Sequence, residues 1–157
     1  MSVPQRAASP ATPQEVVESF LAALAAADFA AAGALLAEDV RYVNVGLPTI
    51  RSRRRTLRVL EPLARRGLGF EVYLHAVAAD GPTVLTERTD VLLLGPVRLQ
   101  FWVSGRFDVR NGQITLWRDA FDYLDMTRSL VRGLLGAVVP VLRPKPPTSA
   151  DTAPRRH

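Results

Sequence analysis

The stretch D-G-P-T-V-L-T-E-R-T-D-V-L-L-L-G-P, residues 80–96, has the pattern of one long β-strand between two turns. Successive side chains of a strand point to opposite faces of its sheet, so alternate residues share a face. Leu92 and Leu94 mark one of these faces as apolar. Arg88 and Asp90 lie on that same face, so a cation and an anion point toward the expected core.

Similar strands lie on both sides of this stretch. Asp80-Gly81 and Asn111-Gly112 favour tight hairpin turns because both residues of each pair readily take positive φ. Gly95-Pro96 supplies a third turn. We therefore expect an antiparallel meander of four long strands, which are residues 70–79, 83–94, 97–110 and 113–122.

Helices are expected before and after this meander. Thr12 and Glu15 are spaced for a capping box that begins the first helix, with Pro13 at its first position, and apolar residues follow at helical spacing. A short strand, R-Y-V-N-V, comes before the third helix, and Pro62 predicts a kink or an early end in that helix. The other expected helices are residues 28–36, 52–66 and 125–139. Helices packed on a curled sheet give an α+β fold with a concave face.

Length and composition limit what the chain can be. Its 157 residues predict one domain over residues 12–142, with a flexible leader at 1–11 and a disordered tail at 143–157. Cysteine is absent and histidine occurs only as His75 and His157, so we expect neither thiolate chemistry nor a histidine-built metal site.

Charge and hydropathy bear on partners and location. The net charge of +5 comes almost entirely from arginine, and we interpret the arginine-rich segment at residues 51–58 as a solvated helix face rather than a nucleic-acid site. No secretory signal opens the chain, and the apolar segment 129–142 is too short to span a bilayer. We expect a cytoplasmic protein without stable membrane insertion.

Two more strands carry polar side chains on a face that is otherwise apolar or aromatic. Tyr42 and Asn44 share one face of the R-Y-V-N-V strand. Asp119 lies between Trp117 and Phe121 on one face of L-W-R-D-A-F. Each strand could instead turn its polar side to water, as antiparallel sheets commonly do. That alternative would expose Leu92, Leu94, Trp117 and Phe121 as well, so the concave interior is the better prediction.

Buried together, these side chains form an acid–base set. Asp90 and Asp119 need a cationic partner away from water, and Arg88 is available. Repulsion between the carboxylates favours one proton on the pair, so one carboxyl is an acid and the other a base. Tyr42 and Asn44 could hold a water molecule beside the base. This set suits the addition of water to a strained, uncharged electrophile such as an epoxide, and the residues alone leave open which Asp is the acid.

The same residues lie in motifs that resemble the limonene-1,2-epoxide hydrolase family, in particular its mycobacterial-type members. The similar segments are Y-x-N at 42–44, G-F-E-V at 69–72, L-T-E-R-T-D at 85–90, G-P-x-R-x-Q-F-W-V at 95–103 and I-T-L-W-R-D at 114–119. The resemblance covers roughly residues 15–139. It implies a strongly curved mixed sheet that forms a cone-like pocket under N-terminal and C-terminal helices, which is the NTF2-like or cystatin-like roll, and it implies a homodimer.

The resemblance also assigns roles. Asp119 would activate water that Tyr42 and Asn44 position, Asp90 would protonate the epoxide oxygen, and Arg88 would bridge the two acids. The implied reaction is concerted and needs no cofactor.

We therefore expect a cofactor-independent epoxide hydrolase for a lipophilic terpenoid, fatty-acid or sterol epoxide. Its pocket wall would include Leu92, Leu94, Trp117 and Phe121. The alternatives are an isomerase or a polyketide-cyclase-like (SnoaL-like) enzyme on the same fold, and a non-catalytic module that binds a hydrophobic ligand. The C-terminal stretch 132–142 could cover the pocket mouth, contact a second subunit or touch a membrane surface.

Overall fold

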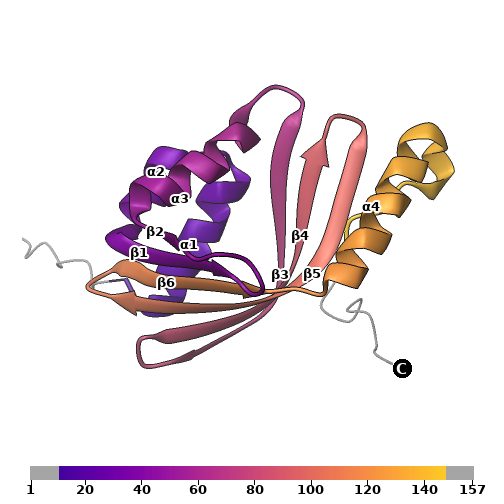
Figure 1. Ribbon diagram of the computed structural model, residues 1–157. Helices are drawn as coiled ribbons and strands as arrows, with labels where there is room; N and C mark the ends of the chain where they lie inside the picture. Colours follow the sequence, from indigo (N-terminus) through magenta and orange to yellow (C-terminus); the bar gives the residue numbers. More distant parts are fainter. Residues whose placement is uncertain (1–10, 148–157) are drawn as a thin grey trace, which may run out of the picture.

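The computed structural model describes residues 11–147, so most of the leader predicted at 1–11 and of the tail predicted at 143–157 lies outside the described residues. Figure 1 labels the helices and strands along the chain. In chain order they are α1 (Pro13–Ala25), α2 (Phe29–Ala34), β1 (Leu36–Asn44), β2 (Ile50–Arg51), α3 (Arg53–Leu60), the 3-10 helix η1 (Glu61–Ala64), β3 (Leu68–Asp80), β4 (Thr83–Leu94), β5 (Val97–Arg110), β6 (Gln113–Ala120), α4 (Tyr123–Val138) and the 3-10 helix η2 (Pro140–Leu142).

The capping box that begins α1 is confirmed. The Thr12 side chain accepts a hydrogen bond from the Glu15 backbone N–H at 3.2 Å, and the Glu15 carboxylate accepts one from the Thr12 N–H at 2.7 Å. The apolar side of α1, which includes Val17 and Phe20, is buried against the sheet. This contact fixes α1 across the concave face.

Helix α3 is shorter than the predicted helix over residues 52–66. It begins after Ser52, whose hydroxyl caps it, and ends at Leu60, where η1 takes over. Pro62 explains the change because proline has no N–H to donate to an α-helical hydrogen bond. The arginines Arg54, Arg55 and Arg58 are exposed, as the solvated-face interpretation predicted.

The six strands form one mixed sheet in the order β2-β1-β6-β5-β4-β3. The predicted meander is confirmed, because β3, β4, β5 and β6 each pair antiparallel with the next. The last strand, β6, pairs parallel with the first strand, β1, and this pairing sets Asn44 opposite Asp119. This pairing brings residues far apart in the sequence onto one face.

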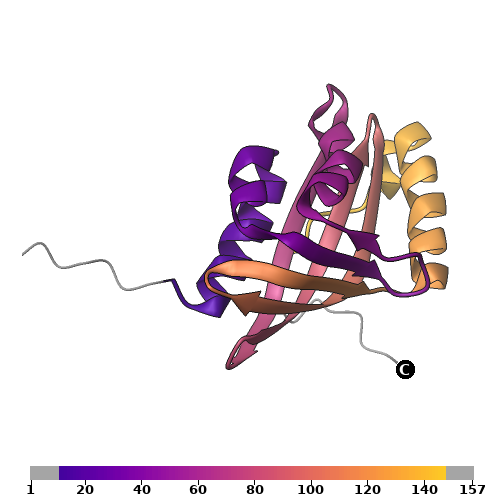
Figure 2. The same cartoon turned by 60° about the vertical axis from the view of Figure 1, so that its left-hand side comes forward.

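The sheet curves strongly, with helices on its concave side (Figures 1 and 2). Helices α1, α2 and α3 lie over one part of the sheet, and α4 lies beside β5. Strand β6 pairs only with Ser104–Arg110 of β5, so the first half of β5 has no strand on that side. Helix α4 lies along this free portion, and the concave face is therefore enclosed by helices at two sides.

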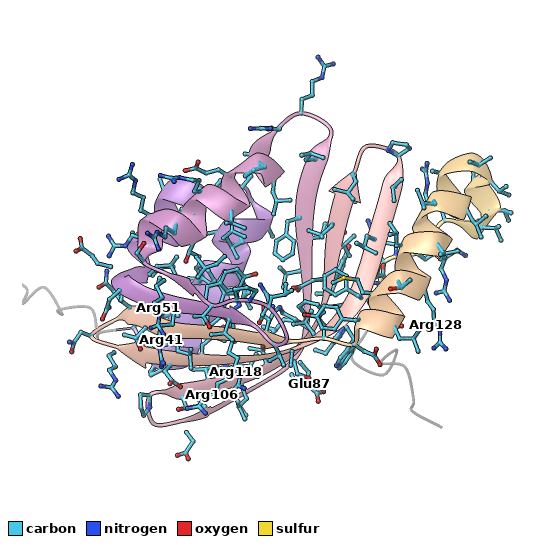
Figure 3. The ribbon with its side chains drawn as sticks, in the orientation of Figure 1. Arg41, Arg51, Glu87, Arg106, Arg118 and Arg128 are labelled. Carbon is cyan, nitrogen blue, oxygen red and sulfur yellow. The ribbon has the colours of Figure 1, made fainter. Side chains whose placement is uncertain are left out.

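The opposite face of the sheet carries charge. Arg118 lies between Trp117 and Asp119, so its side chain points away from the concave face. In the β5–β6 ladder it lies directly opposite Arg106. Arg41 of β1 lies opposite Arg51 of β2 in the same way. Figure 3 shows these four side chains gathered on neighbouring strands. Much of the positive charge therefore lies in solvent, away from the concave interior.

Candidate active site

An apolar cavity of about 200 Å³ lies between the concave face and the helices. The sheet supplies most of its polar groups, and α1, α3 and α4 close its sides. Its lining residues are Leu24, Phe29, Tyr42, Asn44, Leu47, Leu60, Leu63, Phe70, Asp90, Leu92, Phe101, Val103, Trp117, Asp119, Phe121 and Met126. The structure therefore brings together four of the five polar residues predicted from the sequence, and the fifth, Arg88, contacts two of them.

Arg88 joins the two acids. Its side chain is fully buried, and its Nε and Nη2 donate to Asp90 Oδ1 and Oδ2 at 2.8 and 3.1 Å. Nη2 also donates to Asp119 Oδ2 at 2.6 Å. The guanidinium group thus holds one carboxylate with two hydrogen bonds and the other with one, in a buried site where charge-assisted hydrogen bonds are strong.

Asp119 keeps one oxygen without a protein partner. Its Oδ1 is buried, yet accepts no hydrogen bond from any group within residues 11–147. A buried carboxylate oxygen in this condition is costly unless a ligand or water bonds to it. Because Asp119 lines the cavity with Tyr42 and Asn44, Oδ1 is suited to accept a proton from a molecule held there.

The cavity perturbs Asp90 in the direction required of an acid. Burial raises the pKa of Asp90 from 3.8 to about 6, against the lowering effect of Arg88, and the Asp119 charge adds a smaller upward contribution. The sequence argument gave repulsion between the carboxylates as the cause, whereas burial is the larger one. Burial alone would lower the pKa of Arg88, but the Asp119 and Asp90 carboxylates raise it above its usual value.

Tyr42 is held as a neutral phenol. Burial raises its pKa to about 12, and the nearby Asp119 charge contributes to the shift. Its ring stacks on Trp117 at a centroid distance of 4.0 Å. A neutral phenol can donate its O–H to a bound oxygen atom while the stacking contact keeps the ring in place.

Two features of the site differ from the sequence expectation or were missed by it. Leu94 shares the face of Asp90, but it is 39% exposed near the end of β4 and does not line the cavity. Thr86, two residues before Arg88, accepts a hydrogen bond from Arg88 Nη1 at 3.2 Å. Alternation along the strand was enough to place Thr86 on this face. No sequence pattern predicted that Leu47 and Met126 line the cavity, because their positions depend on how loops and helices pack.

Two polar residues outside the cavity have structural roles. His75 contacts the Thr89 hydroxyl at 2.8 Å through Nε2 and stacks on Trp102. Asp122 caps α4 by accepting hydrogen bonds from the N–H groups of Leu124 and Asp125. Within residues 11–147 no group of three or more acidic or imidazole side chains has the arrangement of a metal site.

The model of the limonene-1,2-epoxide hydrolase catalytic domain matches residues 11–132. The chain belongs to the limonene-1,2-epoxide hydrolase family. Epoxide hydrolase EphG of Mycobacterium tuberculosis is 53% identical over 127 residues, which cover 81% of this chain and 85% of that protein. A solved structure of an M. tuberculosis LEH-like epoxide hydrolase superposes with a TM-score of 0.82 at 50% identity, over 85% of this chain and 95% of that one.

More distant structures share the fold alone. A candidate SnoaL-like polyketide cyclase from Shewanella putrefaciens has a TM-score of 0.68 at 16% identity, over 83% of this chain and 98% of that chain. The resemblance noted in the sequence, the α+β roll and the prediction of an epoxide hydrolase are therefore confirmed by the family match.

Proposed function

We propose that this protein adds water to a lipophilic epoxide to give a vicinal diol in one concerted acid–base step, and that it works as a homodimer. The catalytic proposal depends mainly on one observation: Arg88 holds two buried carboxylates inside an apolar cavity, and one of them keeps a free oxygen. The homodimer is carried over from the family resemblance.

The step uses both carboxyl groups at once. Asp119 Oδ1 takes a proton from a water molecule that Tyr42 and Asn44 hold, and the water oxygen bonds to one epoxide carbon. The C–O bond of that carbon breaks, and its electron pair stays on the epoxide oxygen. Asp90 gives its proton to that oxygen, so the product is a neutral diol. Ring strain in the epoxide supplies part of the driving force.

Each turnover leaves the proton on the other acid. Asp119 has gained one proton and Asp90 has lost one, so a proton must return before the next cycle. Arg88 Nη2 bonds to both carboxylates, at 3.1 Å to Asp90 and 2.6 Å to Asp119. The return path therefore runs through this guanidinium group or through solvent in the open cavity.

The cavity limits the size of the substrate. Its volume of about 200 Å³ lies below the ~300–1,000 Å³ typical of ligand pockets. A compact terpenoid epoxide suits this space better than a sterol epoxide does. Among the lining residues within 11–147, Leu47 alone is mostly exposed, at 53%, so a longer substrate would extend outward past it.

The reaction is tested by measuring diol formation in oxygen-18 water from limonene, styrene and sterol epoxides. We expect labelled diol, formed fastest from the two smaller epoxides because the cavity encloses them. An isomerase or cyclase would give a product without oxygen from water, and a ligand-binding module would give no product. Either of those results, obtained with folded protein, would overturn the proposal.

The rate should fall as the pH rises through about 6. The acid works only while Asp90 is protonated, and burial raises its pKa to about 6, so its active form persists to that pH and is lost above it. We expect kcat/KM to decline roughly tenfold per pH unit on the alkaline side, because this ratio reports the free enzyme. A profile measured from about pH 5 to 8 checks this, and kcat/KM that increases across this range would contradict it.

A further inference from the structure

Helix α4 turns its smallest residues inward. Gly133 and Gly136 are buried, and a Cβ atom on Gly133 would lie 2.6 Å from the Arg98 carbonyl oxygen of β5. On Gly136 a Cβ would lie 2.8 Å from the Arg143 Cα. The helix backbone therefore packs closely on its neighbours through glycine, and a side chain at either position would force the helix or its neighbour to move.

The outward side of α4 is apolar. We call the exposed residues Leu124, Val131, Leu134, Leu135 and Val138 the α4 apolar face. Their spacing places them on one side of the helix, and Val138 is 82% exposed. Val141 and Leu142 of η2 continue this exposed apolar run. Single exposed leucines are ordinary, but a contiguous exposed patch marks an interaction surface.

The family's catalytic domain covers only the first part of this face, with Leu124 and Val131. The family match ends at residue 132, so Leu134, Leu135, Val138 and the whole of η2 lie beyond it. The face nevertheless begins at the mouth of the cavity. The Tyr123 hydroxyl, in the first turn of α4, donates to the Val45 carbonyl at 2.6 Å, two residues before the exposed cavity residue Leu47.

The charges beside the α4 apolar face are mostly positive, and the acids Asp122 and Asp125 lie only at the start of the helix. Arg128 and Arg132 are exposed on its flank, and Arg143 and Lys145 follow η2. Figure 3 shows Arg128 extending from α4. Neither Arg128 nor Arg132 forms an ion pair within residues 11–147. The basic groups outnumber the acids beside this face, so its charge suits an anionic surface, and a second copy of the chain is the other occupant that the experiment must separate.

We propose that the α4 apolar face is a docking surface for an anionic lipid bilayer. Its apolar side chains enter the boundary between headgroups and acyl chains, and the arginines contact lipid phosphates, as in interfacial helices. The usual polar side of such a helix is replaced here by its contact with β5. Because no helix within residues 11–147 is long and apolar enough to cross a membrane, the contact is peripheral. If the proposed function holds, a lipophilic epoxide can pass from the bilayer to the cavity beside Leu47.

The test is co-sedimentation of the full chain with vesicles, either of phosphatidylglycerol and phosphatidylcholine in equal parts or of phosphatidylcholine alone. We expect binding to the anionic vesicles that weakens as salt increases. Val138→Asp should reduce the partition coefficient by at least about tenfold, because it places a charge in the apolar contact. Removing Arg128 and Arg132 by alanine should reduce it about fivefold for each.

Leu85→Asp is the matched control, because Leu85 is an exposed apolar residue on β4, far from α4 in the sequence, and the charge change is the same. Equal loss of binding in this control, or no binding of the wild type to anionic vesicles, would overturn the proposal. Velocity sedimentation of Val138→Asp tests the other occupant: conversion of a dimer to a monomer would show that a second copy covers the face.

Vesicle binding is measured without substrate, so it stands or fails apart from the catalytic proposal. Diol formation from free styrene oxide should be the same in Val138→Asp and the wild type. A wild type that binds vesicles but forms no diol would leave the docking surface intact and would disprove epoxide hydrolysis.

Discussion

Replacing Asp119 with asparagine is expected to lower kcat for epoxide hydrolysis by about 10²–10⁴-fold, the usual contribution of a general base. Asparagine has nearly the same size as aspartate, but its amide does not accept the proton of the attacking water. The remaining charges still balance, because Arg88 keeps its two hydrogen bonds to Asp90. We therefore expect the variant to fold.

The measurement is single-substrate kinetics in oxygen-18 water, with circular dichroism and urea unfolding to show that the variant is folded. Asp108→Asn is the control, because Asp108 pairs with Arg106 in a partly exposed ion pair outside the cavity. We expect little change there, since exposed ion pairs contribute ~0–1 kcal/mol. If Asp119→Asn retained wild-type kcat, Asp119 would not be the base and the proposed mechanism would be wrong.

Local sequence patterns were sufficient for much of this fold. The capping box at Thr12 and the hairpin dipeptides at 80–81 and 111–112 each depend on only a few neighbouring residues. Alternation along β4 placed Arg88 and Asp90 together because both lie on one strand. These features could be predicted because their causes are local.

Features that depend on distant packing could not be predicted in the same way. The parallel pairing of β1 with β6 joins segments on either side of the meander, and it was expected only from the family resemblance. Leu94 lies on the same face of β4 as Asp90 and Leu92, but it is beyond the end of the cavity. In α4 the apolar spacing would ordinarily predict a buried leucine side, whereas glycine faces the protein and the leucines face solvent.

The importance of Gly105 for the site is visible only in the structure. It lies on β5 directly between Thr86 of β4 and Asp119 of β6. A Cβ atom there would lie 2.5 Å from the Thr86 hydroxyl and would collide with Arg88 Nη1. The space for the guanidinium group that bridges the two acids therefore depends on the absence of a side chain at this position.

Gly105→Ala is expected to displace Arg88 and to lower kcat by about a hundredfold, the usual cost of misplacing a catalytic group by about 1 Å. Crowding in the packed interior should also lower the free energy of unfolding by about 1–3 kcal/mol. Urea unfolding and kcat measured on the same samples check both effects. Gly69→Ala is the matched control, since its Cβ would meet only the Leu93 side chain, and the nearest atom, at 3.2 Å, is the flexible Cδ1.

The pH profile separates a positioning role from a general loss of stability. Arg88 lowers the pKa of Asp90, so a displaced guanidinium group should let that pKa rise above about 6. The alkaline limb of kcat/KM in Gly105→Ala should then move to higher pH, even as the rate falls. A variant that is only less stable would keep the wild-type limb once measured where it is folded. An unmoved limb together with wild-type kcat would show that Arg88 does not depend on Gly105 for its place between the acids.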